Sequence, residues 1–125
     1  MQHVVTSSDK AYRILRSIAF KEVEEFWAMA LRADKSLIRT ELLFRGTADC
    51  CLIHPRDVFR FALRHNASSL LVAHNHPSQN PMPSDMDVQL THQLVQAGRL
   101  MQIPILDHII VAARSYVSFA DEGWI

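Results

Sequence analysis

The sequence has few cysteines that could form disulfide bonds, and it lacks long apolar segments that could cross a membrane. Its 125 residues include only two cysteines, Cys50 and Cys51, and a disulfide between sequence neighbours is strained. The pair lacks the Cys-x-x-Cys spacing of a zinc or redox site, so we expect two apolar strand residues, the alternative being a reactive or metal-binding thiol. No apolar run approaches a membrane span, and residues 1–10 lack a signal-peptide core. We therefore expect a soluble, cytoplasmic protein.

Neither sign of charge is in excess. Thirteen Lys and Arg residues balance thirteen Asp and Glu residues, so net charge gives no support for binding to the phosphate backbone of nucleic acid, although a local basic patch stays open. Hydrophobic residues make up 49% of the chain, which is enough to bury one proper core at this length. We expect one domain, residues 1–125, whose oligomeric state the sequence does not indicate.

Hydrophobic periodicity and turn residues predict helices alternating with strands. Ser7 and Ser8 can cap a first helix, Pro55 suits a first helical turn, and Gly98 is placed to stop a third helix. Short apolar runs indicate strands, two of them joined in a hairpin by a turn at residues 34–36. The expected helices are residues 9–20, 55–65 and 84–97, and the expected strands are residues 26–31, 37–44, 50–53, 69–73, 104–113 and 116–119.

Residues suited to metal chemistry gather between His74 and Asp87. His74 directly follows an expected buried strand, and strand ends are where open α/β sheets place their ligands. His74 and His76 share a face if that segment is extended, and Asp87 lies on the same helical face as Ser84. The loop between these two pairs carries three prolines, which lower its flexibility. Two imidazoles and a carboxylate, with a fourth position for water, are typical of a catalytic zinc site.

These residues also have ordinary structural interpretations. Ser84 and Asp87 match the Ser-x-x-Asp variant of a capping box, so both could simply start a helix. A lone histidine is more often a surface or core residue than a ligand, and we expect this of His3, His54, His65 and His92. The joint spacing of histidines, serine and aspartate is harder to explain by chance than either pair alone.

That joint spacing, His-x-His-Pro, six residues and then Ser-x-x-Asp, resembles the JAMM motif of metalloproteases, which is also called JAB or MPN+. Other stretches resemble the bacterial RadC family, namely Gly-Thr at residues 46–47, Pro-Arg-Asp-Val-Phe at residues 55–59 and Leu-Asp-His-Ile-Ile-Val at residues 106–111. The similarity covers about Glu25 to Ser118. It implies a three-layer α/β/α fold around a central mixed sheet, which is JAB/MPN-like and has the cytidine deaminase-like architecture.

The chain also departs from the RadC pattern. Longer RadC proteins carry an N-terminal helix-hairpin-helix region associated with DNA binding, and we expect this chain to have no room for one. Gln79 stands where the family commonly has glycine after His-Pro-Ser, and this difference changes loop flexibility more than ligand chemistry.

The resemblance further implies a glutamate before an apolar strand, which acts on the water that attacks the substrate. Glu25, directly before Phe26, fits this position best, because a residue at a strand start is fixed in space. Glu22 and Glu24 are competitors. All three could instead form a solvated acidic helix end.

The roles implied by the resemblance give a mechanistic hypothesis. His74, His76 and Asp87 would hold Zn²⁺, Glu25 would act as general base, and Ser84 would donate a hydrogen bond to the developing oxyanion. The expected function is a zinc metallopeptidase that cleaves a peptide or isopeptide bond in a peptide or protein substrate.

Two questions stay open. Asp107 and His108 lie next to each other on an expected strand, so at most one faces the site, where it would orient a ligating imidazole; the alternative is a structural hydrogen bond. The function could also be that of a non-catalytic interaction module linked to DNA repair, as the RadC name implies. A zinc deaminase is disfavoured because its His-x-Glu and Pro-Cys-x-x-Cys signatures are missing.

Overall fold

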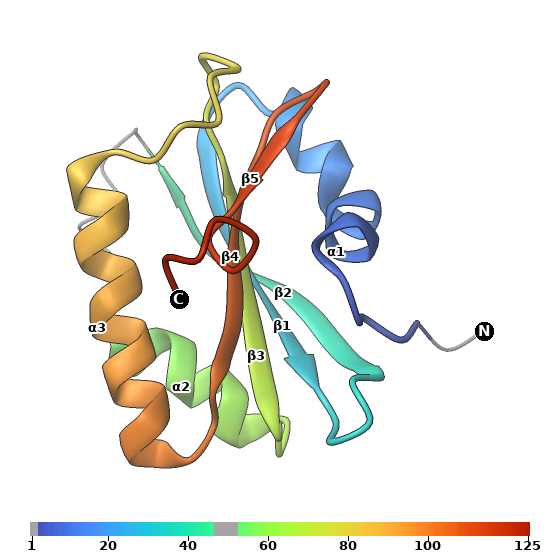
Figure 1. Cartoon of the computed structure of the whole chain (residues 1–125), viewed down its shortest axis with the longest axis vertical. Helices are drawn as coiled ribbons and strands as arrows, with labels where there is room; N and C mark the ends of the chain where they lie inside the picture. The colour runs from blue at the N-terminus through green and yellow to red at the C-terminus, as the bar shows by residue number, and fades with distance from the viewer. Residues whose placement is uncertain (1–2, 47–52) are drawn as a thin grey trace.

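The computed structural model describes residues 3–46 and 53–125, which form a five-stranded mixed sheet with helices on both faces (Figure 1). The strand order is β2-β1-β3-β4-β5. This arrangement confirms the expected α/β class, with three layers and a central mixed sheet. The strands are β1 (Glu24–Leu31), β2 (Leu37–Gly46), β3 (Ser69–Asn75), β4 (Ile105–Val111) and β5 (Tyr116–Ser118). The helices are α1 (Ser8–Leu15), a 3-10 helix η1 (Arg16–Phe20), α2 (Pro55–Arg64) and α3 (Asp85–Met101).

Alternate residues of the central strands pack against different helices. Ala28 and Ala30 of β1 and Val72 of β3 join the core that α2 and α3 cover. Met29 and Leu71 belong to the second core, on the face that α1 covers. Figure 1 shows α2 and α3 on one side of the sheet and α1 on the other. Because residues two apart in a strand share a face, this division decides which polar residues at the strand ends can meet.

The register of β3 brings polar residues from three strands to the α2/α3 face. β1 runs antiparallel to β3 with Phe26 opposite His74, and β4 runs parallel to β3 with His108 opposite Val72. Directly paired residues share a face of the sheet. His74 and His108 therefore lie on the same face, and so does Glu24, which stands two residues before Phe26.

The end of α3 differs from the prediction. Gly98 does not stop the helix, which continues to Met101 and ends at Gln102 in a left-handed conformation with φ of 58°. A Cβ atom on Gly98 would lie 2.7 Å from the carbonyl oxygen of Ile103. The glycine therefore allows the returning chain to pass close to the helix, which is a packing role rather than a stop signal.

The other expected elements are confirmed where the structure describes them, with two qualifications. The first expected helix changes to 3-10 geometry after Leu15. The expected strand at residues 50–53, with Cys50 and Cys51, lies outside the described residues except for Ile53. Within the described ranges, no helix is long and apolar enough to cross a membrane.

Candidate metal centre

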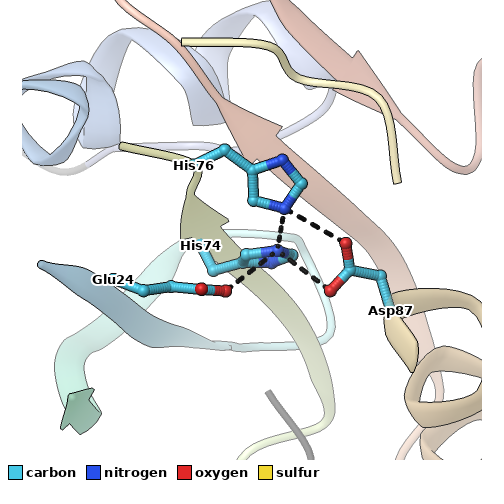
Figure 2. Close-up of side chains that lie close together, drawn as sticks. All are labelled: Glu24, His74, His76 and Asp87. Carbon is cyan, nitrogen blue, oxygen red and sulfur yellow. Dashed lines mark hydrogen bonds and ion pairs between the residues drawn. The ribbon is translucent and has the colours of Figure 1, made fainter. Parts of the chain in front are cut away.

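Four side chains from three segments of the chain converge at the end of β3 (Figure 2). Glu24, His74, His76 and Asp87 each offer one ligand atom, and these atoms lie within 4.8 Å of one another. The Nε2 atoms of the two histidines are 3.0 Å apart. Donor atoms around a tetrahedral zinc ion are separated by roughly 3.3 Å, given bonds of about 2.0–2.1 Å. The four residues thus form a group that could hold a metal ion.

Each donor is positioned by the element that carries it. Glu24 is the first residue of β1, His74 is the penultimate residue of β3, and Asp87 lies in the first turn of α3. His74 Nε2 is 3.5 Å from Glu24 Oε1 and 3.3 Å from Asp87 Oδ1, and His76 Nε2 is 3.1 Å from Asp87 Oδ2. The side chain of His76 is 17% exposed, whereas the other three are at most 7% exposed. Solvent therefore reaches the group from the side of His76.

The hydrogen bonds of His76 direct a lone pair into the group. Its Nδ1 lies 2.8 Å from the carbonyl oxygen of Asn80, which can only accept, so the ring proton is on Nδ1. When Nε2 carries no proton, its lone pair is directed towards His74 and Asp87. Asp87 Oδ1 is buried and has no hydrogen-bond partner among the described residues. A buried acceptor without a donor is costly, and a bound cation would satisfy it.

The electrostatics of the group favour a positive charge. Burial alone would raise the pKa of Asp87, but interactions with His74 and His76 hold that pKa well below its ordinary value. Burial alone would lower the pKa of His76, yet the Asp87 carboxylate and the Asn80 carbonyl raise it. The ionised aspartate therefore favours a cation beside it, and either a proton or a metal ion can supply that charge.

Glu25 does not join this group, which corrects the expected position of the glutamate. Its carboxylate accepts a hydrogen bond from Trp27 Nε1 at 3.0 Å and lies 3.3 Å from Arg45 Nε, while its backbone N–H donates to Asn75 Oδ1. Glu25 and Glu24 point to opposite faces of β1. The register in which β1 pairs with β3 determines which of the two glutamates faces His74. This register depends on contacts between distant segments, which local sequence patterns do not predict.

Ser84 lies beside Asp87 and caps α3. Its Oγ accepts from the backbone N–H of Asp87 at 3.1 Å, and its own N–H donates to Asp87 Oδ2 at 2.9 Å. The same Oδ2 also faces His76, so Asp87 is both a member of the capping box and a candidate metal ligand. Ser84 Oγ acts only as an acceptor in the hydrogen bonds of the described residues, which leaves its proton available to a ligand.

A family model for the RadC-like JAB domain matches residues 5–124. The chain belongs to this family. It is 44% identical over 117 residues to a UPF0758 protein of Thermotoga maritima, covering 94% of this chain and 53% of the relative. It is 40% identical over 123 residues to a UPF0758 protein of Protochlamydia amoebophila, covering 98% and 53% respectively. The chain spans about half the length of the curated RadC-like relatives it matches.

Gln79 fixes the loop of this RadC-like domain that carries His76. Its backbone has a φ of 68°, a conformation that favours glycine. Its side chain donates to the carbonyl of Ala19 and accepts from the N–H of Ala113, both at 2.8 Å. Its own N–H donates to the carbonyl of His76 at 2.8 Å. The glutamine thus ties the histidine loop to two segments that are distant in sequence.

His108 is the member of the Asp107-His108 pair that faces the candidate metal centre. Its Nε2 lies 2.8 Å from His74 Nδ1, and the ring is fully buried. Burial and the neighbouring His74 hold the pKa of His108 well below its ordinary value, so the ring is neutral. Asp107 points to the other face, where it accepts from Ser118 Oγ. Burial raises the pKa of Asp107, although its hydrogen bonds oppose this.

Proposed function

We propose that this RadC-like domain is a zinc-dependent hydrolase that cleaves a peptide or isopeptide bond. The observation that carries the proposal is the convergence of two imidazole nitrogens and two carboxylates, from three segments of the chain, on one largely buried point. This donor set suits Zn²⁺. Membership of a JAB domain family and the resemblance of the His-x-His and Ser-x-x-Asp spacing to the JAMM motif support the assignment.

In this proposal His74, His76 and Asp87 hold the metal ion, and Glu24 is the general base. A zinc ion with three protein ligands lowers the pKa of a water molecule to about 7 and polarises a carbonyl group. Glu24 has the longest contact of the group, 3.5 Å from His74 Nε2, which suits a residue that reaches a water molecule rather than the ion. Its carboxylate takes a proton from the attacking water and returns it to the leaving amine.

Ser84 has the role of oxyanion donor. Its Oγ is held by the N–H of Asp87 at the start of α3, and its proton is available on the more exposed side of the group. Loss of one such donor in other hydrolases costs about 2.7–4 kcal/mol of transition-state stabilisation. A peptide is expected to approach from the side of His76, the most exposed of the four side chains, where Ser84 is also exposed.

The metal assignment is tested by elemental analysis of protein purified without chelators. His76→Ala removes a proposed ligand, and His92→Ala is the matched control because His92 is an exposed histidine on α3. We expect one zinc ion per chain in wild type and in His92→Ala, and loss of zinc in His76→Ala. Metal-free wild type that takes up no added zinc would contradict the proposal and favour an interaction module.

The hydrolase assignment needs a second measurement. Zinc-loaded protein is incubated with a proteome-derived peptide mixture, and new amino termini are identified by mass spectrometry. We expect cleavage that disappears in His76→Ala and persists in His92→Ala. Isopeptide-linked conjugates are tested beside the peptides by the appearance of free lysine side-chain amines. Zinc-loaded wild type that produces neither new amino termini nor free lysine amines would contradict hydrolysis without contradicting the metal centre.

A further inference from the structure

A chain of hydrogen bonds behind the metal centre connects His74 to the backbone of Asp87. Thr91 Oγ1 lies 2.7 Å from the carbonyl oxygen of Asp87 and 2.6 Å from His108 Nδ1. His108 Nε2 lies 2.8 Å from His74 Nδ1. Thr91, His108 and His74 are all fully buried, so water does not replace any partner in this chain.

The protons in this chain can be assigned by counting donors. The two contacts of Thr91 Oγ1 require two hydrogens, but the hydroxyl has only one and the carbonyl of Asp87 has none. The hydroxyl therefore donates to the carbonyl, and His108 Nδ1 supplies the second hydrogen. The ring of His108 is fully buried, and its two nitrogens contact Thr91 Oγ1 and His74 Nδ1, neither of which is an anion that would compensate a charged ring. With its single proton on Nδ1, the ring has an unprotonated Nε2, which must accept from His74 Nδ1. In the neutral form of His74, which is the form that binds metal ions, Nε2 is then the nitrogen without a proton, and it points at the other ligand atoms.

The rings are also held in orientation. Phe119 stacks on His108 with ring centroids 4.8 Å apart and planes inclined by 12°. Phe26 stacks on His74 with centroids 6.0 Å apart and meets His108 edge-on. The side chain of Thr91 is fixed by its place one helical turn after Asp87 in α3.

We propose that Thr91 and His108 are positioning residues that set the tautomer of His74, so that its Nε2 is ready to bind a metal ion before the ion arrives. The inference rests on the proposed metal centre. With valine at position 91, the Nδ1 proton of His108 would lose its acceptor in a buried site. The ring would then favour the tautomer protonated at Nε2, which donates to His74 Nδ1 and places the proton of His74 on Nε2. A ligand nitrogen that carries a proton cannot coordinate.

The test compares Thr91→Val with Thr91→Ser, which restores the hydroxyl, and with Thr40→Val as the matched control. Thr40 lies in the middle of β2, opposite Met29, and its Oγ1 has no hydrogen-bond partner among the described residues. Zinc affinity is measured by competition with a chromophoric chelator. We expect Thr91→Val to bind zinc about ten- to a hundredfold more weakly, as is typical when a group behind a ligating histidine is lost. Thr91→Ser and Thr40→Val should bind zinc as wild type does.

A second readout does not depend on metal binding, and its wild-type arm does not depend on a variant that folds. Long-range ¹H–¹⁵N correlation spectra of the metal-free wild type distinguish protonated from unprotonated ring nitrogens. We expect His74 and His108 both to carry the proton on Nδ1 in wild type, and His74 to carry it on Nε2 in Thr91→Val. A wild-type His74 protonated at Nε2 would overturn the inference, as would equal zinc affinities of Thr91→Val and Thr40→Val. Failure of wild type to bind zinc would instead count against the proposed function, and the spectra would still decide the tautomer.

Discussion

Glu24→Gln and Glu25→Gln form a matched pair that tests which glutamate acts on the substrate. The two residues are neighbours in sequence and both are buried, yet only Glu24 lies beside His74, 3.5 Å from Nε2. Glutamine keeps the size of the side chain and an acceptor oxygen but cannot take a proton. Loss of a general base reduces turnover by about 10²–10⁴-fold. We expect Glu24→Gln to show that loss.

The same pair separates a base from a ligand. Zinc at a free concentration of 1,000 times its dissociation constant adds about 4.1 kcal/mol to the free energy of unfolding. If His74, His76 and Asp87 are the protein ligands, Glu24→Gln keeps most of this gain, and one zinc ion per chain is still found by elemental analysis. A Glu24→Gln protein that no longer binds zinc would show that Glu24 is a ligand instead.

Glu25→Gln should leave the rate of hydrolysis unchanged and lower the free energy of unfolding only slightly. The amide oxygen can still accept from Trp27 Nε1, and the lost ion pair involves an Arg45 side chain that is 61% exposed. Pairs exposed on both sides contribute about 0–1 kcal/mol, and because Glu25 is only 3% exposed we expect a loss at the upper end of this range. The assay is initial-rate hydrolysis of the best-cleaved peptide by zinc-saturated protein, beside thermal unfolding with and without zinc. Full activity in Glu24→Gln together with inactive but folded Glu25→Gln would refute the assignment of the base.

Three further variants test packing, loop anchoring and pH dependence. Gly98→Ala should lower the free energy of unfolding by about 1–3 kcal/mol in urea titrations, because its Cβ would meet Ile103 O, and a more stable protein would contradict this close approach. Gln79→Ala keeps the strained φ and loses two side-chain hydrogen bonds, so we expect its free energy of unfolding to fall by about 1–2 kcal/mol. Gln79→Gly loses the same bonds but relieves the strain, so its free energy of unfolding should fall by less. Equal decreases in the two variants would show that strain is not involved. The raised pKa of Asp107 means that the folded state holds its proton more tightly than the unfolded chain, so ionisation of Asp107 disfavours folding above the folded pKa. Measured in EDTA, the stability of Asp107→Asn relative to wild type should therefore increase from pH 4 to pH 7, and a constant or decreasing difference would argue against the shift.

Local sequence signals predicted the parts of the site that depend on local structure. The apolar run before His74 predicted a buried strand, and the Ser-x-x-Asp spacing placed Asp87 in the first turn of a helix. The structure brings both residues together with His76. These predictions succeed because strand length, helix capping and stiff loops are determined over a few residues.

The errors arose where the answer depends on pairing between distant segments. The sequence favours Glu25, which directly precedes the apolar run, but the alignment of Phe26 with His74 turns Glu24 to the site instead. Gly98 looked like a helix stop because glycine often ends helices. Its actual role comes from the chain at Ile103, which returns across the helix.

The carboxylate of Asp87 serves both the start of α3 and the candidate metal centre, so the helix end should respond when a metal ion binds. Oδ2 holds the N–H of Ser84 and also faces His76, whereas Oδ1 has no donor among the described residues. Chelation of a bound metal would replace two positive charges beside this carboxylate by at most the proton of a histidine, and would weaken the first turn of the helix, where the local opening free energy is small. Amide hydrogens of that turn should then exchange with solvent faster without metal than with it. Occupancy of the site could be followed at a helix end before any substrate is known.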